Sequence, residues 1–155
     1  KHDRDGSVWE HPYHCTVIQS GQHLLNCLRY VDLNMVRAGV VAHPRDWAWC
    51  GYDELTGKRQ RYRILDLEHL LARLEWRSVR ELQQWYADAI DDQLAREKPS
   101  REPLWTESLA VGQQDFVQGL SQEYRGRARY EYAQTPSGTW HVREENPAYS
   151  TKNNL

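Results

Sequence analysis

With 155 residues the chain is long enough for one domain or two small ones, and only 39% of its residues are hydrophobic. Its 20 basic and 22 acidic residues give a net charge of −2, so local patches, not the whole surface, would have to attract nucleic acid. No stretch approaches the roughly 20 apolar residues of a membrane span, and this predicts a cytoplasmic protein without membrane contact.

The first predicted element is a strand. In VWEHPYHCTVI, apolar and polar residues alternate from Trp9 to Val17, which is the pattern of a half-buried strand, and Pro12 indicates an edge or a bulge. Because this segment follows so closely on Lys1, we expect the chain to be the later part of a longer protein.

A helix is predicted next, with a cap at Ser20 and an end at Gly39. Tyr30 and Asn34 lie one turn apart on one flank of this helix, with His23 two turns before Tyr30. We expect the neighbouring apolar side to hold the helix against the core and the Tyr30 hydroxyl to face a cleft. The apolar side is formed by Leu24, Leu28, Val31 and Met35.

A loop, a basic connector and a helical hairpin are predicted after this helix. Trp47, Trp49 and Tyr52 are expected to anchor the loop, and TGKRQRYR forms the connector. Asp66 is a suitable cap for a helix over DLEHLLARL, and SVRELQQWYADAIDDQLAR has apolar residues at helical spacing. These two segments predict a hairpin of helices.

The last third of the chain gives weaker signals. WTESLAVGQQDFVQGL suggests two short helices around Gly112, where ordinary helix capping is the preferred interpretation and the turn of a helix-turn-helix is the alternative. The segments RARYEYAQ and TWHVREEN are consistent with a weak pair of strands before a polar tail.

Two parts of the sequence together resemble one protein family. GSVWE, followed by HLLNCLRYVDLNMVRAGVVAHPRDWAWCGYDEL, closely resembles the segment around the catalytic tyrosine of REP-associated tyrosine transposases, members of the HUH nuclease superfamily. The similarity covers roughly residues 5–55 and is specific, because Tyr-x-x-x-Asn is followed by Val-Arg-Ala-Gly and a Pro-x-x-Trp loop. WTESLAVGQQDFV is similar to a C-terminal block in one branch of that family.

The resemblance implies DNA transposition by a bacterial, nucleoid-associated nuclease. Such an enzyme cuts and rejoins single-stranded DNA beside hairpins, the repetitive extragenic palindromes. Tyr30 would match the nucleophile that forms a 5′-phosphotyrosine, and Asn34 would match the residue that helps two upstream histidines hold Mg²⁺ or Mn²⁺. The chemistry is consistent, since a phenol is a weak nucleophile that a nearby cation can activate.

The histidines depart from the family pattern. The family has a His-apolar-His pair before its tyrosine, and none of the histidines that precede Tyr30 here has that spacing: His2, His11, His14 and His23. Because two metal ligands are missing, we expect that this chain alone neither binds the metal nor cleaves DNA.

Two groups of cations are candidate DNA contacts. The first group surrounds Tyr62, in a loop that can hold phosphates while the tyrosine stacks on a base; a solvated connector is an equally good interpretation. It consists of Lys58, Arg59, Arg61 and Arg63. The second group alternates along the chain, so an extended backbone would place its members on one face: Arg125, Arg127 and Arg129.

We therefore predict an α+β chain, made of the last strand and the tyrosine helix of a partial, ferredoxin-like HUH domain and a mainly helical C-terminal region. The expected divisions are the HUH part at 1–55, a basic linker at 56–66, a helical region at 67–125 and an extended tail at 126–155. The predicted function is that of a transposase, with a non-catalytic DNA-binding remnant and a helical protein-interaction fragment as alternatives.

Overall fold

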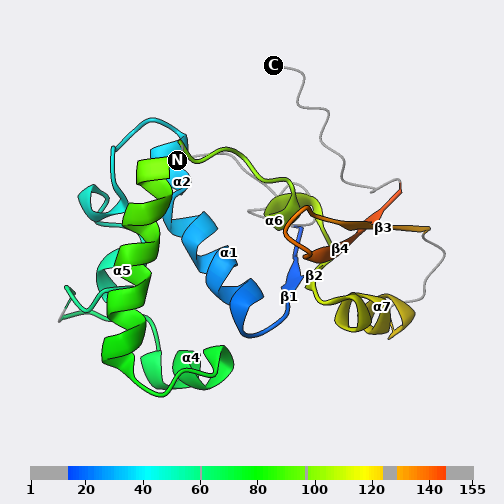
Figure 1. The fold of residues 1–155 in the computed structure, drawn as a ribbon, viewed down its shortest axis with the longest axis horizontal. Helices are drawn as coiled ribbons and strands as arrows, with labels where there is room; N and C mark the ends of the chain where they lie inside the picture. Colours follow the sequence, from blue (N-terminus) through cyan, green and yellow to red (C-terminus); the bar gives the residue numbers. More distant parts are fainter. Residues whose placement is uncertain (1–13, 60, 97, 124–128, 146–155) are drawn as a thin grey trace, which may run out of the picture. The chain divides into compact units, whose positions relative to one another are not determined.

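The structure of the chain is a computed structural model that describes residues 14–59, 61–96, 98–123 and 129–145. The fold is α+β, as predicted, and it divides into two compact units (Figure 1). We call Ile18–Glu102 the helical unit, and the residues up to Val17 together with those from Pro103 onward the sheet unit. Among the described residues, none of the helices combines the length and apolar character needed to cross a membrane.

These units divide the chain differently from the expected segments. The basic segment 56–66 lies inside the helical unit, and the region 67–125 is split between the two units. The expected tail at 126–155 contains two strands of a sheet. A division by composition misses these boundaries, because the sheet unit is assembled from both ends of the chain.

The helical unit contains five α-helices and a short 3-10 helix in its described residues. In chain order these are α1 (Gln22–Asp32), α2 (Asn34–Arg37), η1 (Pro44–Asp46), α3 (Tyr52–Leu55), α4 (Leu67–Leu74) and α5 (Val79–Arg96). Asp66 caps α4 as predicted, since its side chain accepts a hydrogen bond from the His69 N–H. The predicted hairpin is present, because α4 packs against α5.

The tyrosine helix begins and continues differently from the prediction. Gly21, not Ser20, is the N-cap, and its φ is 74°. No side chain caps the helix, and the Gly21 N–H donates a hydrogen bond to the Arg73 carbonyl oxygen of α4. The helix is also interrupted at Leu33, which ends α1 and precedes α2. The hydrogen bond of Gly21 to α4 and the burial of Leu33 therefore outweigh the local signals, which predicted a cap at Ser20 and one continuous helix to Gly39.

The predicted apolar side of this helix is wrong by about a quarter turn. Val31 is 56% exposed, whereas Leu25 and Val36 are buried in the core. At about 100° per residue, Leu25 and Val36 share one face with Asp32, which is 3% exposed. The prediction missed this face because it contains a buried carboxyl among its apolar residues. Leu24 and Leu28 are partly buried at its edge.

The core of the helical unit is completed by large side chains of α3 and α5. Leu82, Tyr86 and Ile90 lie on the inner face of α5, and Tyr52 and Leu55 come from α3. The aromatic anchors expected in the preceding loop are only partly confirmed. Tyr52 is buried, but Trp49 is 85% exposed and anchors nothing in the core.

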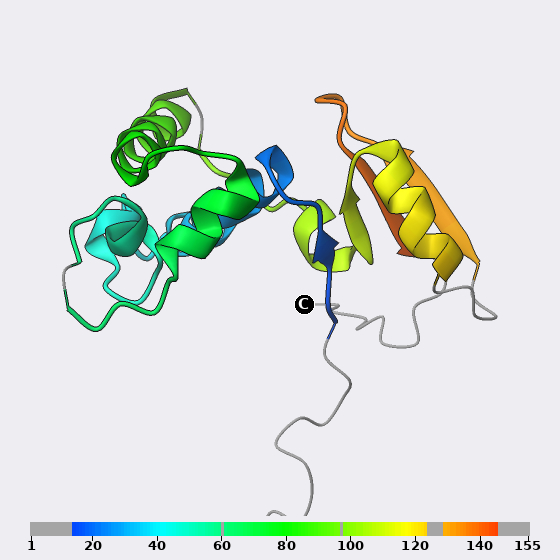
Figure 2. The same cartoon turned by 90° about the horizontal axis from the view of Figure 1, so that it is seen from below.

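The sheet unit pairs four short strands in the order β1-β2-β4-β3. The described elements are β1 (Val17–Ile18), whose second residue is the first of the helical unit, α6 (Leu104–Glu107), β2 (Ala110–Gly112), α7 (Gln114–Glu123), β3 (Tyr130–Gln134) and β4 (Trp140–Glu144). In the antiparallel register, Val142 lies opposite both Ala110 and Tyr132. Helix α7 packs along this sheet (Figure 2). Its Val117 joins Ala110 and Val142 in a small core.

The predictions for this unit have mixed outcomes. The pair of strands near the end of the chain is confirmed as the β3–β4 hairpin. The interpretation of Gly112 as a helix cap or helix-turn-helix turn is wrong, because Ala110–Gly112 is an inner strand hydrogen-bonded to β4. Of the strand predicted from Trp9 to Val17, residues up to 13 lie outside the described residues, and in the remainder only Val17 is in a strand.

Candidate functional site

Tyr30 and Asn34 are brought together by Arg37, which was not among the predicted site residues. The Arg37 guanidinium lies over the Tyr30 ring, 3.8 Å from the ring centroid. Its Nη1 donates to the Tyr30 carbonyl oxygen at 2.8 Å, and its Nη2 donates to Asn34 Oδ1 at 3.2 Å. Tyr30, Asn34 and Arg37 thus form a cluster on one side of α1 and α2, which we call the tyrosine cluster.

Helix geometry explains why these three residues meet. Asn34 is four residues after Tyr30, and Arg37 is three after Asn34 and seven after Tyr30. Residues at these spacings lie on the same side of a helix. The opposite side is fixed in the core by Leu25, and Val36 holds α2. Arg37 is the arginine of the Val-Arg-Ala-Gly sequence and lies seven residues, or about two helical turns, after Tyr30. This spacing is the sequence signal that could have identified it.

The tyrosine cluster lies at the surface of the helical unit. Tyr30 and Arg37 are half-buried, and Asn34 is exposed. A guanidinium that is already held by a carbonyl and an amide is oriented at little further entropic cost, and its planar fork suits phosphate oxygens. The arrangement can therefore place a phosphate beside a phenol.

Behind the cluster, a buried polar network positions the helix that carries Tyr30. Asp32 Oδ1 accepts a hydrogen bond from the Gly51 N–H at 2.9 Å, and Oδ2 accepts one from the Tyr86 hydroxyl at 2.8 Å. Burial is the main influence that raises the pKa of Asp32, and it also raises the pKa of Tyr86 well above its ordinary value. The network joins α1 to α5 and to the start of α3.

The predicted metal ligand has a different role in the structure. Asn34 Oδ1 is engaged by Arg37. In the part of the chain that the structure describes, no group of three or more His, Cys, Asp or Glu side chains is placed to hold a metal ion. His23 is partly buried, burial lowers its pKa, and its Nδ1 has no hydrogen-bond partner. The described residues therefore do not form the complete ligand set that the family resemblance implies.

The basic connector is held by a buried carboxylate. Glu54, which is 3% exposed, accepts hydrogen bonds from the N–H groups of Ile64 and Leu65, both at 2.8 Å. Arg59 pairs with Glu54 at 3.6 Å and donates to the Ala48 carbonyl. Arg59 therefore has a structural role in fixing this loop, in addition to any contact with DNA.

The other predicted cations of the connector point outward. Arg61 and Arg63 are exposed on either side of Tyr62, which has a φ of 55° and is 92% exposed. Lys58 is also exposed, with its Nζ 5.3 Å from the Tyr52 ring centroid. An outward aromatic ring between two cations is an arrangement that can stack on a base and bind the adjoining phosphates.

The second predicted group of cations can be placed only in part. Arg125 and Arg127 lie outside the described residues. Arg129 is exposed just before β3, in the sheet unit, and its carbonyl accepts a hydrogen bond from the Glu145 N–H. The structure therefore does not test whether the three arginines share one face.

Comparison with known proteins adds no assignment. Neither a protein-family model, nor a curated protein, nor a solved structure matches the chain.

Proposed function

We propose that the chain carries the nucleophile of a tyrosine nuclease that transposes single-stranded, hairpin-bearing DNA. The observation that supports this most is the tyrosine cluster, in which a guanidinium spans the Tyr30 ring and the Asn34 amide. The proposed fold family is that of the HUH nucleases, with α1 as the tyrosine helix. This assignment rests on the resemblance of residues 5–55 to REP-associated tyrosine transposases.

The proposed reaction needs only one exchange at phosphorus. The Tyr30 oxygen attacks the scissile phosphate, the bond from phosphorus to the 3′-oxygen breaks, and the phenolic proton is released while the 3′-oxygen gains one. The products are a 5′-phosphotyrosine and a free 3′-OH. Because the phosphoester energy is kept in the new bond, attack by a 3′-OH reverses the step and rejoins DNA. Arg37 would bind the phosphate oxygens beside the phenol.

The family also implies Mg²⁺ or Mn²⁺, held by Asn34 and two imidazoles. Asn34 Oδ1 accepts a hydrogen bond from Arg37, and the described residues contain no group of three or more His, Cys, Asp or Glu side chains placed to hold a metal ion, so we derive no step through one. One amide oxygen is far from the near-octahedral set that Mg²⁺ needs. This is why we propose that cleavage requires the family's His-apolar-His segment in addition to the residues of this chain.

The test is formation of a covalent protein–DNA adduct. The chain is incubated with a hairpin-flanked single strand and Mn²⁺, alone and after fusion to the His-apolar-His segment of a relative. We expect an adduct only from the fusion protein, and none after Tyr30→Phe in that fusion. Tyr62→Phe, which removes a hydroxyl from an exposed ring, is the matched control and should keep the adduct. An adduct that survives Tyr30→Phe would refute the nucleophile assignment.

A DNA-binding protein without catalysis is the second candidate. The exposed Arg61, Tyr62 and Arg63 favour it, because this loop has the cation and aromatic contacts of single-strand binding without any catalytic group. Binding by the fusion protein with no adduct under any metal condition would favour this candidate over the nuclease.

A further inference from the structure

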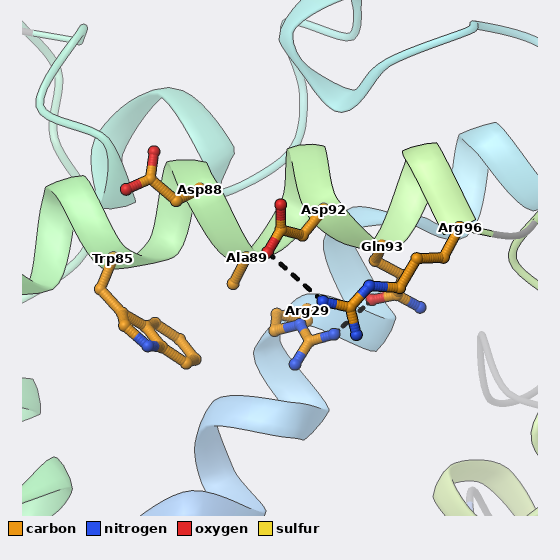
Figure 3. A pocket seen from close by; sticks show the side chains of 7 residues that line it. All are labelled: Arg29, Trp85, Asp88, Ala89, Asp92, Gln93 and Arg96. Atoms are coloured by element: carbon orange, nitrogen blue, oxygen red, sulfur yellow. Dashed lines mark hydrogen bonds and ion pairs between the residues drawn. The ribbon is translucent and has the colours of Figure 1, made fainter.

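A pocket of about 460 Å³ opens between α1 and α5 of the helical unit (Figure 3). Tyr30 does not line this pocket, although its chain neighbour Arg29 does. The lining combines one aromatic ring with two cations, two anions and an amide: Arg29, Trp85, Asp88, Ala89, Asp92, Gln93 and Arg96. This lining offers hydrogen-bond donors, acceptors and an aromatic wall in one place.

The flat wall is the indole of Trp85. Trp85 projects from α5 into the space that Arg29 enters from α1 (Figure 3). The ring of Trp76 packs against that of Trp85, with 5.6 Å between the ring centroids. This contact orients Trp85, so that a planar ligand would meet a prepositioned stacking surface.

The guanidinium of Arg29 is held in place but not fully used. Its Nη2 donates to Gln93 Oε1 at 2.6 Å, which fixes the guanidinium at the pocket wall. Its Nε is buried and has no hydrogen-bond partner. Because that buried nitrogen is out of reach of a ligand, the donors left for a ligand's acceptor edge are the N–H groups of Nη1 and the second N–H of Nη2.

The charges of the pocket argue against a simple anion as its ligand. Two arginines are balanced by two aspartates, and Asp92 pairs with Arg96 at 3.7 Å in an exposed and therefore weak ion pair. A ligand that suits such a site is a planar ring with acceptors on one edge and donors on another. Guanine has this pattern, because O6 and N7 accept from arginine and the N1–H and N2–H groups donate to a carboxylate.

We propose that this pocket binds a guanine nucleotide, with the base stacked on Trp85, Arg29 at the O6 and N7 edge, and Asp92 at the N1 and N2 edge. The base belongs either to a free nucleotide or to a single strand of DNA. Only the second source rests on the proposed function, and the proposal of the base site itself does not require Tyr30 chemistry.

The first experiment measures binding of dGMP, dAMP, dCMP and dTMP to the full chain by titration calorimetry. We expect dGMP to bind most tightly and Trp85→Leu to weaken it by about tenfold or more, the loss of one base stacking on an aromatic ring. Trp49→Leu, at an exposed tryptophan outside the pocket, is the matched control and should bind dGMP unchanged. Equal affinities for the four nucleotides would overturn the proposal.

Trp85 also packs against the core, so Trp85→Leu could weaken binding by disturbing the fold. A second variant, at an exposed residue, avoids this ambiguity. Asp92→Asn changes an exposed side chain and should remove most of the preference for dGMP over dAMP, since the carboxylate pairs with donors that adenine lacks on that edge. An unchanged preference would refute the assignment of Asp92 and of guanine. Tyr30→Phe should bind dGMP as tightly as the parent chain does. The guanine site and the nuclease activity are therefore tested independently, and failure of one does not imply failure of the other.

The source of the base is distinguished by competition. Labelled dGMP is bound first, and an unlabelled single-stranded oligonucleotide with one guanine or unlabelled dGMP is then added. If the site serves DNA, the oligonucleotide should displace the label at a concentration at least about tenfold lower than unlabelled dGMP does, since phosphate contacts add affinity. If free dGMP competes as well as the oligonucleotide, the site serves a free nucleotide. Failure of both ligands to compete at this pocket would overturn the proposal.

Discussion

The Tyr86 hydroxyl on α5 donates to Asp32 Oδ2 on α1 across 2.8 Å, and both side chains are buried. Tyr86→Phe would leave a buried carboxyl oxygen without this partner, so we expect the free energy of unfolding to fall by about 1–3 kcal/mol. Urea denaturation measures this change. Tyr62→Phe removes a hydroxyl from a ring that is 92% exposed and should leave the stability unchanged. Equal effects of the two substitutions would argue against the network.

Asp32 should also make the stability depend on pH. Burial raises the pKa of its carboxyl, although hydrogen bonds from Tyr86 and Gly51 oppose this. The native state then keeps a proton that the unfolded state has released, so the stabilisation is complete below about pH 4 and is lost as pH rises through the native pKa. We expect Asp32→Asn to flatten the decrease in the free energy of unfolding that urea denaturation measures as pH rises above about 4. Parallel pH profiles would contradict the prediction.

The buried face of α1 can be tested by substitution on its two sides. Leu25→Ala should lower the free energy of unfolding by about 2–5 kcal/mol, because Leu25 is 2% exposed. Val31→Ala should change it by less than about 0.5 kcal/mol, since that side chain is 56% exposed. Thermal or urea denaturation compares them directly. A larger loss for Val31→Ala would restore the apolar side first predicted from the sequence.

The connector should loosen when its buried anchor is weakened. Glu54→Gln keeps the shape of the side chain but removes the charge that accepts from the Ile64 and Leu65 N–H groups. Charge-assisted hydrogen bonds are roughly twice as strong as neutral ones, so these two amides should exchange with solvent faster. Hydrogen exchange by NMR measures this. The Thr56 amide, bonded to the Tyr52 carbonyl, is the internal reference and should be unaffected.

Single-stranded DNA binding should depend on the outward cations of the connector. Binding is expected to weaken with added salt, and the double substitution of Arg61→Ala with Arg63→Ala should reduce the slope of log K against log salt by about 1.4. Arg77→Ala with Arg80→Ala removes the same charge from exposed positions just before α5 and in its first turn, and should leave the slope unchanged. Fluorescence anisotropy at several salt concentrations gives the slopes. Equal changes in both double variants would indicate a non-specific charge effect.

Secondary structure was predictable where one local signal dominates. The helix over Leu67–Leu74 begins at a residue whose side chain caps it, and α5 repeats its apolar residues at helical spacing. The strand Ala110–Gly112 was not predictable from its neighbourhood, because three residues carry too little periodicity. Its structure depends on pairing with β4, about thirty residues later in the chain.

The sequence predicted two of the three residues of the tyrosine cluster, but not the contacts that join them. Helical spacing correctly placed Tyr30 and Asn34 on one side, but it did not identify Arg37, since a charged residue near a helix end is usually solvated. The structural role of Arg59 was also hidden, because its partner Glu54 reads as an ordinary surface residue in the sequence. Buried charges such as Glu54 and Asp32 are the feature that sequence patterns represent least well.

The interruption of the helix at Leu33 makes the tyrosine cluster more sensitive to insertions and deletions than to changes of residue type. Tyr30 lies before the interruption, whereas Asn34 and Arg37 lie after it. One residue added at this point would turn α2 by about 100° relative to α1 and carry the amide and the guanidinium away from the ring. The same rotation would also turn Val36, which holds α2 in the core, so an insertion at this point would cost stability as well as the cluster.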